Sequence, residues 1–103
     1  MYTIEVKDNS KERVIVICPS LISMKDWIYT MLLRAMREDI ALDVCAPTMR
    51  EILSHYTTQM INLDDFDDEV GYNSFTTYHD VRYVVKYKDL QRTRNGNSSA
   101  QGR

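Results

Sequence analysis

The sequence predicts an α+β protein with a single small domain, and three observations support this prediction. Residues 21–38 carry apolar side chains at helical spacing, residues 14–18 form the unbroken apolar run of a buried strand, and residues 81–87 alternate in polarity. With 103 residues, the chain has room for one modest hydrophobic core. We therefore expect one domain over residues 1–90, followed by a flexible polar and basic tail over residues 91–103.

The first half of the predicted domain consists of a strand hairpin followed by a long helix. Residues 2–7 alternate like a half-buried strand, and a polar turn leads from them into the apolar run. Pro19 ends that run because it has no N–H to donate to a sheet. Ser20 or Ser23 can then cap the helix over residues 21–38, because a serine hydroxyl accepts backbone N–H groups at a helix start.

A second passage from strand to helix is predicted in the middle of the chain. Residues 41–45 have the pattern of a short strand, and Thr48 and Glu51 have the spacing of a capping box for a second helix. A strand, a helix and a strand of these lengths favour a parallel pair of strands. With a hairpin over residues 75–87, the element order is strand, strand, helix, strand, helix, strand. We expect a mixed sheet of four or five strands, with both helices on one of its faces.

The first predicted helix carries a wider apolar surface than one sheet can cover. Tyr29, Leu33 and Met36 extend its core-facing arc, so that more than half of the helix circumference is apolar. This helix flank packs against the second helix, or it forms a surface for a partner or for a second copy of the chain. The sequence leaves both alternatives open, and a homodimer is one consequence of the second.

Composition argues against several classes of protein. No apolar run approaches 18 residues, and no basic segment precedes an apolar one at the N-terminus, so neither a membrane span nor a secretory signal is expected. Two cysteines, Cys18 and Cys45, are too few for a disulfide scaffold, and no spacing of Cys, His or acidic residues matches a metal site. We expect a cytoplasmic protein without a metal or a cofactor.

Charge is distributed unevenly along a chain whose formal net charge is only −2. Residues 61–80 contain six acidic side chains and no lysine or arginine, whereas residues 81–103 contain six basic side chains and one acid. An acidic block would steer a basic partner protein through long-range attraction. This acidic block consists of Asp64, Asp65, Phe66, Asp67, Asp68 and Glu69. Calcium binding is a weaker alternative, because the alternate acids and the central glycine of an EF-hand loop are absent.

The basic C-terminal region suggests a different function, because it interleaves aromatic and basic residues. Stacking rings and cations that neutralise phosphates are what a single-stranded nucleic acid requires. The residues that would bind it are Tyr78, Arg82, Lys86, Lys88, Arg92 and Arg94. Binding of a single-stranded nucleic acid is therefore the alternative function.

A thiol enzyme is the third alternative. Cys18 and Cys45 each precede a predicted helix, whose positive dipole end would stabilise a thiolate. Neither cysteine belongs to a CxxC pair, and an apolar residue precedes each of them, which is more typical of a buried structural thiol.

Because no catalytic constellation is visible, we expect a non-enzymatic protein-binding or regulatory module. The acidic block and the helix flank are its expected contact surfaces. A short acidic chain without cofactor or catalytic signatures is similar in character to small viral or phage accessory proteins that inhibit or modulate a larger host protein. No motif assigns the chain to a family.

Overall fold

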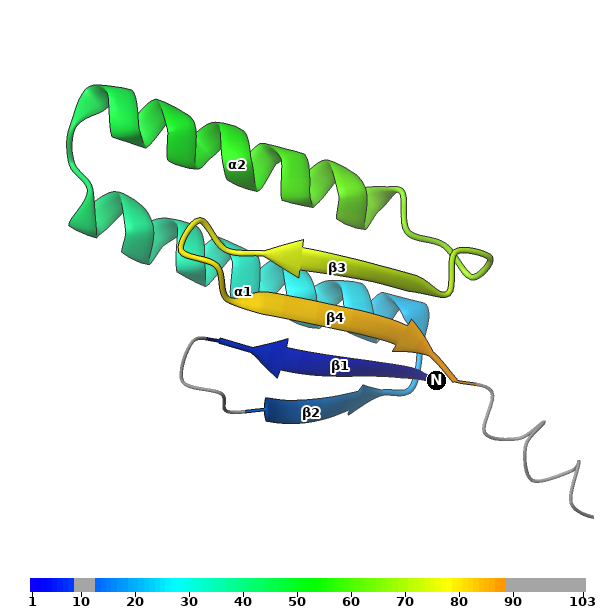
Figure 1. Ribbon diagram of the computed structural model, residues 1–103. Helices are drawn as coiled ribbons and strands as arrows, with labels where there is room; N and C mark the ends of the chain where they lie inside the picture. The colour runs from blue at the N-terminus through cyan, green and yellow to red at the C-terminus, as the bar shows by residue number, and fades with distance from the viewer. Residues whose placement is uncertain (9–12, 89–103) are drawn as a thin grey trace, which may run out of the picture.

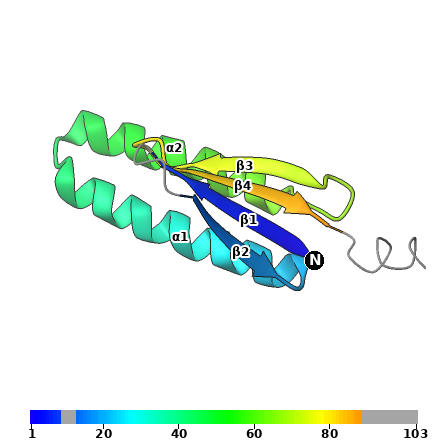
Figure 2. The same cartoon turned by 60° about the horizontal axis from the view of Figure 1, so that its bottom comes forward.

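The computed structural model describes residues 1–8 and 13–88, and it confirms the α+β class. Two helices pack against one face of a four-stranded sheet, as Figures 1 and 2 show. The predicted tail over residues 91–103 lies outside the described residues. The elements along the chain are β1 (Tyr2–Lys7), β2 (Arg13–Cys18), α1 (Leu21–Leu42), α2 (Ala46–Asp64), β3 (Tyr72–Thr76) and β4 (Arg82–Tyr87).

The sheet is entirely antiparallel, so the prediction of a mixed sheet is wrong. Its strand order is β2-β1-β4-β3, which places the first and the last strand of the chain side by side in the centre. Tyr2 pairs with Cys18 on β2 and with Tyr87 on β4. The predicted hairpins, β1 with β2 and β3 with β4, are both present.

The predicted strand over residues 41–45 is absent, and with it the parallel pair of strands. α1 continues to Leu42, where the N–H of Asp43 donates to the carbonyl of Asp39, and α2 begins at Ala46. A run of five residues is too short for periodicity to separate the last turn of a helix from a strand. The two helices therefore form an antiparallel hairpin with a tight connection, and the chain does not return to the sheet between them (Figure 1).

The sequence predicted the N-terminal cap of α1 but not that of α2. Ser20 caps α1, and its hydroxyl accepts the N–H of Ser23 in a capping box, as predicted for one of the two serines. The predicted capping box at Thr48 and Glu51 is wrong, because α2 starts earlier and has Cys45 at its N-cap. Pro47 lies in the first turn of α2, where a missing N–H costs nothing.

The hydrophobic core lies between the helix pair and the sheet. α1 packs against β1 and β2, whereas α2 packs against β3 (Figure 2). Side chains alternate along each strand, so one set of residues faces the helices and the other set faces away from them. The enclosed side chains include Met24, Ile28 and Leu32 from α1, Ile52, Tyr56 and Leu63 from α2, and Tyr2, Ile4, Cys18, Phe75, Tyr83 and Val85 from the sheet.

Candidate functional site

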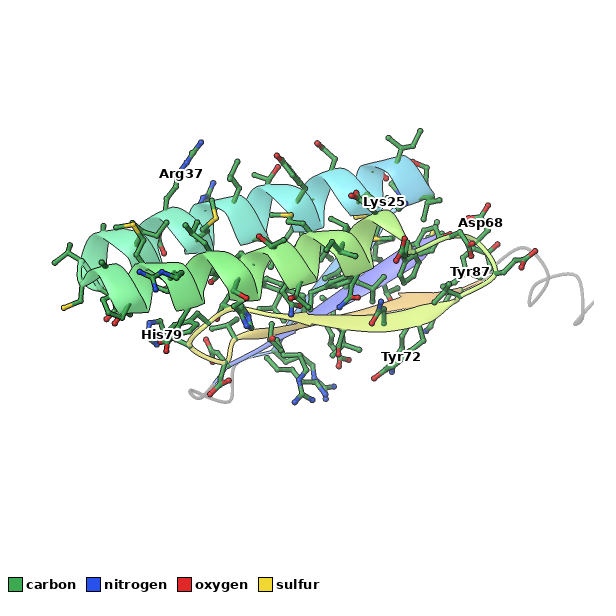
Figure 3. The ribbon with its side chains drawn as sticks, turned by 90° about the horizontal axis from the view of Figure 1, so that it is seen from above. Lys25, Arg37, Asp68, Tyr72, His79 and Tyr87 are labelled. Atoms are coloured by element: carbon green, nitrogen blue, oxygen red, sulfur yellow. The ribbon has the colours of Figure 1, made fainter. Side chains whose placement is uncertain are left out.

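No described element covers the sheet face that points away from the helices. We call it the open face. The strand registers and the alternation of side chains assign to it Thr3, Glu5 and Lys7 from β1, Arg13, Ile15 and Ile17 from β2, Tyr72, Ser74 and Thr76 from β3, and Arg82, Val84 and Lys86 from β4. Figure 3 shows Tyr72 pointing away from the helix layer.

The open face carries exposed apolar side chains on its two edge strands. The exposed fractions of Ile15 and Ile17 are 58% and 61%, and that of Tyr72 on the opposite edge strand is 58%. Val84 belongs to the same face but is buried at 5%, because it lies on a central strand among the longer side chains of its neighbours. β-Branched side chains on a sheet are usually covered by a further layer of protein. The exposed isoleucines therefore suggest that a partner covers this face.

The bases of the open face have an acidic partner near β2 but not near β4. Glu5 lies 3.4 Å from the ammonium of Lys7 and 3.6 Å from the guanidinium of Arg13. Arg82 and Lys86 have no acidic side chain within ion-pair distance in the described part of the chain, and Lys88 beyond the end of β4 has none either. The β4 side of the open face therefore presents positive charge that an acidic surface would complement.

A hollow of about 120 Å³ lies between Ile15 on β2 and the bases near β4. The side chains around it are Thr3, Glu5, Ile15, Val84, Lys86 and Lys88. It has an apolar floor and a charged rim, which suits a single apolar side chain of a binding partner more than a cofactor.

The residues predicted to bind nucleic acid do not all share this face. Arg82 and Lys86 lie on it, and Lys88 borders its hollow, but Tyr78 lies in the turn between β3 and β4 and donates its hydroxyl to Glu51 on α2, at 3.2 Å. Arg92 and Arg94 fall outside the described residues. Tyr72 is the one aromatic residue that the described strands contribute to this face. The cations are therefore gathered there, but a row of stacking rings is not.

The acidic block is partly used for contacts inside the chain. Phe66 is buried in the core, and the hydroxyl of Tyr2 donates to Asp68 at 2.5 Å. Burial, and then this hydrogen bond, raise the pKa of Tyr2. Asp67 accepts the N–H groups of Glu69 and Val70 and so closes its own turn. The side chains of Asp64, Asp65 and Glu69 are exposed and have no partner among the described residues.

Replacing Asp67 with alanine should therefore lower the free energy of unfolding by about 1 kcal/mol, since the N–H of Glu69 loses its acceptor and that of Val70 keeps only the Asp67 carbonyl. Asp65→Ala is the matched control, and we expect it to change the free energy by less than about 0.5 kcal/mol because that side chain has no partner. Urea denaturation measures both values. Equal losses in the two variants would contradict a structural role for Asp67.

The helix flank is covered in part by its own chain. Met36 packs against the core, and Leu33 is half-buried. Tyr29 stays 49% exposed and, together with Ile22, lines a groove near the C-terminal end of α2. The packing of α1 on α2 thus accounts for most of the apolar excess that the sequence shows, and Tyr29 is the part that remains available to a partner.

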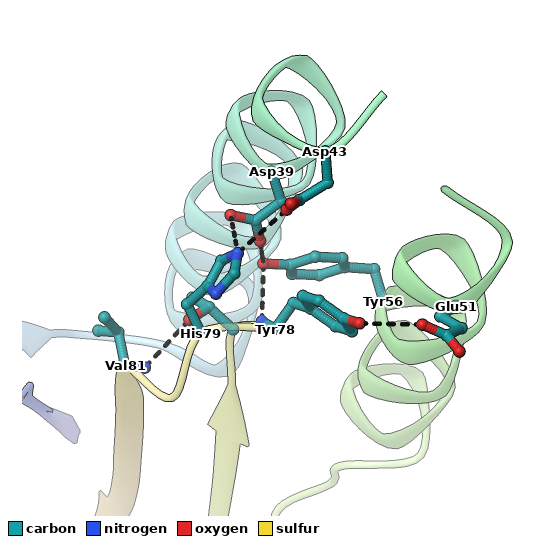
Figure 4. Close-up of polar contacts among 8 residues, drawn as sticks. Asp39, Asp43, Glu51, Tyr56, Tyr78, His79 and Val81 are labelled. Atoms are coloured by element: carbon teal, nitrogen blue, oxygen red, sulfur yellow. Dashed lines mark hydrogen bonds and ion pairs between the residues drawn. The ribbon is translucent and has the colours of Figure 1, made fainter. Parts of the chain in front are cut away.

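A buried hydrogen-bond cluster holds the two helices and the β3–β4 turn together (Figure 4). The hydroxyl of Tyr56 donates to Asp39 Oδ2 at 2.5 Å and accepts the N–H of Tyr78 at 3.0 Å. His79 Nε2 lies 3.6 Å from Asp39 Oδ1 and 3.3 Å from Asp43 Oδ2. Burial, and then the bond to Asp39, raise the pKa of Tyr56. The Tyr56 hydroxyl has a partner on both sides, so the geometry favours a structural role.

Asp39 is the residue of this cluster that sequence reasoning missed. It is 7% exposed, although it is an acid within a helix of mixed polarity. The signal was its spacing, because Asp39 follows Ile28, Leu32 and Ala35 at the intervals of one helix face. An acidic side chain on the apolar face of a helix indicates a buried hydrogen-bond partner, and here that partner is the hydroxyl of Tyr56.

The two cysteines have different environments. Cys18 is buried at the end of β2, and burial raises the pKa of its thiol, which disfavours the reactive thiolate. Cys45 is exposed at the start of α2 and makes no side-chain capping bond. Within residues 1–8 and 13–88, no group of three or more His, Cys, Asp or Glu side chains is arranged to hold a metal ion.

Comparisons with known proteins do not assign the chain to a group. No protein-family model matches it, and no curated protein or solved structure shows significant similarity to it. Neither described helix combines the length and the apolar character that crossing a membrane requires.

Proposed function

We propose that this chain is a non-enzymatic protein-binding module that docks through the open face of its sheet. The observation that supports this most directly is an uncovered antiparallel sheet face that has exposed β-branched side chains and, on one side, bases without acidic partners. Exposed apolar side chains together with charged ones are typical of protein interfaces. By covering a surface of a larger protein, such a module would inhibit or modulate it.

The charge of the face defines the kind of partner. Arg82, Lys86 and Lys88 would attract an acidic protein surface, and the hollow beside Val84 would accept one of its apolar side chains. The acidic block carries the opposite sign, and two of its acids already serve contacts within the chain. We therefore place the partner on the open face, and we keep the exposed acids as a secondary steering element. Two free thiols, Cys18 and Cys45, fit a reducing compartment such as the cytoplasm.

Single-stranded nucleic acid is the second candidate, because the same three bases would neutralise phosphates. The placement of the aromatic residues supports it less well. Tyr83 is buried against Trp27, Tyr87 packs edge-on against Tyr2, and Tyr78 contacts α2, so none of these rings belongs to the open face that carries the bases.

Site-specific photo-crosslinking in the native cells tests the proposal. A benzophenone amino acid replaces Tyr72 on the open face or, as the matched control, Tyr29 on the helix layer, because both are exposed tyrosines. We expect a crosslinked protein from position 72 that disappears when Arg82 and Lys86 are also changed to glutamate. The same adduct should weaken as salt is raised, because the rim contacts are ionic.

Two results would contradict this assignment. Crosslinking from position 29 alone would place the interface on the helix flank. Micromolar binding of a fluorescent oligonucleotide at low salt, lost in the same glutamate variant, would support the nucleic-acid alternative instead.

A further inference from the structure

β2 is an edge strand that lacks the features by which edge strands avoid pairing. Its one neighbour among the described strands is β1, and the register with β1 runs without interruption over all six residues. The strand contains neither proline nor glycine, and its one charged residue, Arg13, stands at its start. Proteins usually protect an exposed edge with a central charge, a proline or a bulge. The outward N–H and C=O groups of β2 are therefore available to another strand.

We propose that a second copy of this chain pairs with β2 in antiparallel fashion, so that two sheets join into one of eight strands around a two-fold axis. Such a contact is isologous, because the same strand is used by both copies and the assembly closes as a dimer. A two-fold axis perpendicular to the sheet keeps the open faces of both copies on the same side. With the axis at Val16, Ile15 of each copy then lies opposite Ile17 of the other across the junction, where directly opposed side chains are about 5 Å apart.

Charge supports a second copy at this edge. Glu5 pairs with both Lys7 and Arg13 and offsets one of their two charges, so the β2 side of the open face repels a second copy less than the β4 side does. The β4 side carries unpaired bases and would repel its own copy. Asn73 and Ser74 make the other edge strand, β3, polar, and its stretch of five residues follows a glycine in a left-handed conformation.

The helix layer adds apolar area beneath the joined strands. Lys25 reaches the Asp64 carbonyl and Asp39 reaches Tyr56, so these residues mark the side of α1 that faces α2. By helical spacing, Trp27 and Met31 lie on the other flank, and both are only partly buried. A standard interface buries roughly 800 Å² per partner, and a single strand edge provides less than this. We therefore expect a reversible dimer with a dissociation constant on the order of micromolar.

Sedimentation velocity of the full chain over a wide concentration series tests the proposal without any partner protein. We expect the wild type to pass from monomer to dimer as concentration rises. Ile15→Lys and Ile17→Lys should each raise the dissociation constant by at least about tenfold, because a charged side chain would replace one isoleucine in both of the Ile15–Ile17 contacts at the junction. Tyr72→Lys is the matched control, since it adds the same charge at the same exposure on the opposite edge, and it should leave the dimer intact.

Hydrogen exchange of the wild type provides a readout that does not depend on a variant. Amides of β2 should become more protected as concentration rises, and those of β3 should not. A wild type that stays monomeric, a dimer that survives both β2 variants, or a dimer that Tyr72→Lys disrupts equally would overturn the proposal. This outcome is independent of the crosslinking from position 72, because self-association is measured with the chain alone.

Discussion

Replacing Asp39 with alanine should lower the free energy of unfolding by about 3 kcal/mol, because a buried tyrosine hydroxyl loses its charged acceptor. The side chain of Tyr56 is 1% exposed, so water cannot take the place of Asp39 without opening the helix pair. The same substitution removes one of the two carboxylates beside His79 in the β3–β4 turn. Denaturation in urea, followed by circular dichroism, measures the loss.

Asp43→Ala is the matched control for this prediction. Asp43 lies one turn further along the chain and also contacts His79, but it is more exposed and has no bond to Tyr56. We expect it to cost less than about 1 kcal/mol, as is usual for a surface ion pair. If Asp39→Ala and Asp43→Ala cost the same, the burial of the Asp39–Tyr56 bond contributes nothing. In a double-mutant cycle, Tyr56→Phe should recover much of the Asp39→Ala loss, because the unpaired hydroxyl is then absent.

Stability should fall steeply above about pH 10. Burial and hydrogen bonds to Asp68 and Asp39 raise the pKa values of Tyr2 and Tyr56 above the ordinary value of 10.0. A group whose pKa is higher in the folded state than in the unfolded state stabilises the fold below the unfolded pKa. That contribution is lost as pH rises above it, because the unfolded chain releases the proton first. Melting temperatures between pH 8 and 11.5 measure the effect.

Phenylalanine variants separate the two tyrosines in this experiment. Tyr2→Phe and Tyr56→Phe should each make the alkaline decline shallower, and the double variant should make it shallower still. Tyr72→Phe is the control, because Tyr72 is exposed on the open face and its removal should leave the curve unchanged. An unchanged alkaline decline in the double variant would show that other groups cause it.

Local patterns were sufficient to predict the strands at both ends of the chain and, for β1 and β4, the side of the sheet to which each residue points. The apolar run over residues 14–18 predicted a buried strand, but β2 lies at the edge of the sheet and its Ile15 and Ile17 are exposed. Val81, Tyr83, Val85 and Tyr87 alternate with Arg82, Val84 and Lys86, and the structure separates the two sets as predicted. Period-two alternation is a property of the extended backbone itself, so it needs no knowledge of neighbouring strands. The helical spacing of α1 and α2 was equally informative, except at the ends of the helices.

The predictions were wrong where the pattern of a short segment was compatible with two different structures. Residues 41–45 fit a strand as well as a helix end, and in the structure α1 continues to Leu42 and a short connection leads to α2. The burial of Asp39 was missed because its partner Tyr56 is 17 positions away on another helix, where no local pattern could reveal it. Likewise, Phe66 was assigned to a binding surface because acids surround it, whereas the core encloses it.

What the sequence determined by itself is the set of amphipathic elements and, within each strand, the residues that share a face. The order β2-β1-β4-β3, and therefore the identity of the edge strands, was decided only by the tertiary structure. The open face combines residues from opposite ends of the chain, such as Thr3 and Lys86, which pair across β1 and β4. Pairing between distant strands follows from how the whole chain buries its apolar area, and this total is a property of the assembled fold rather than of any one segment.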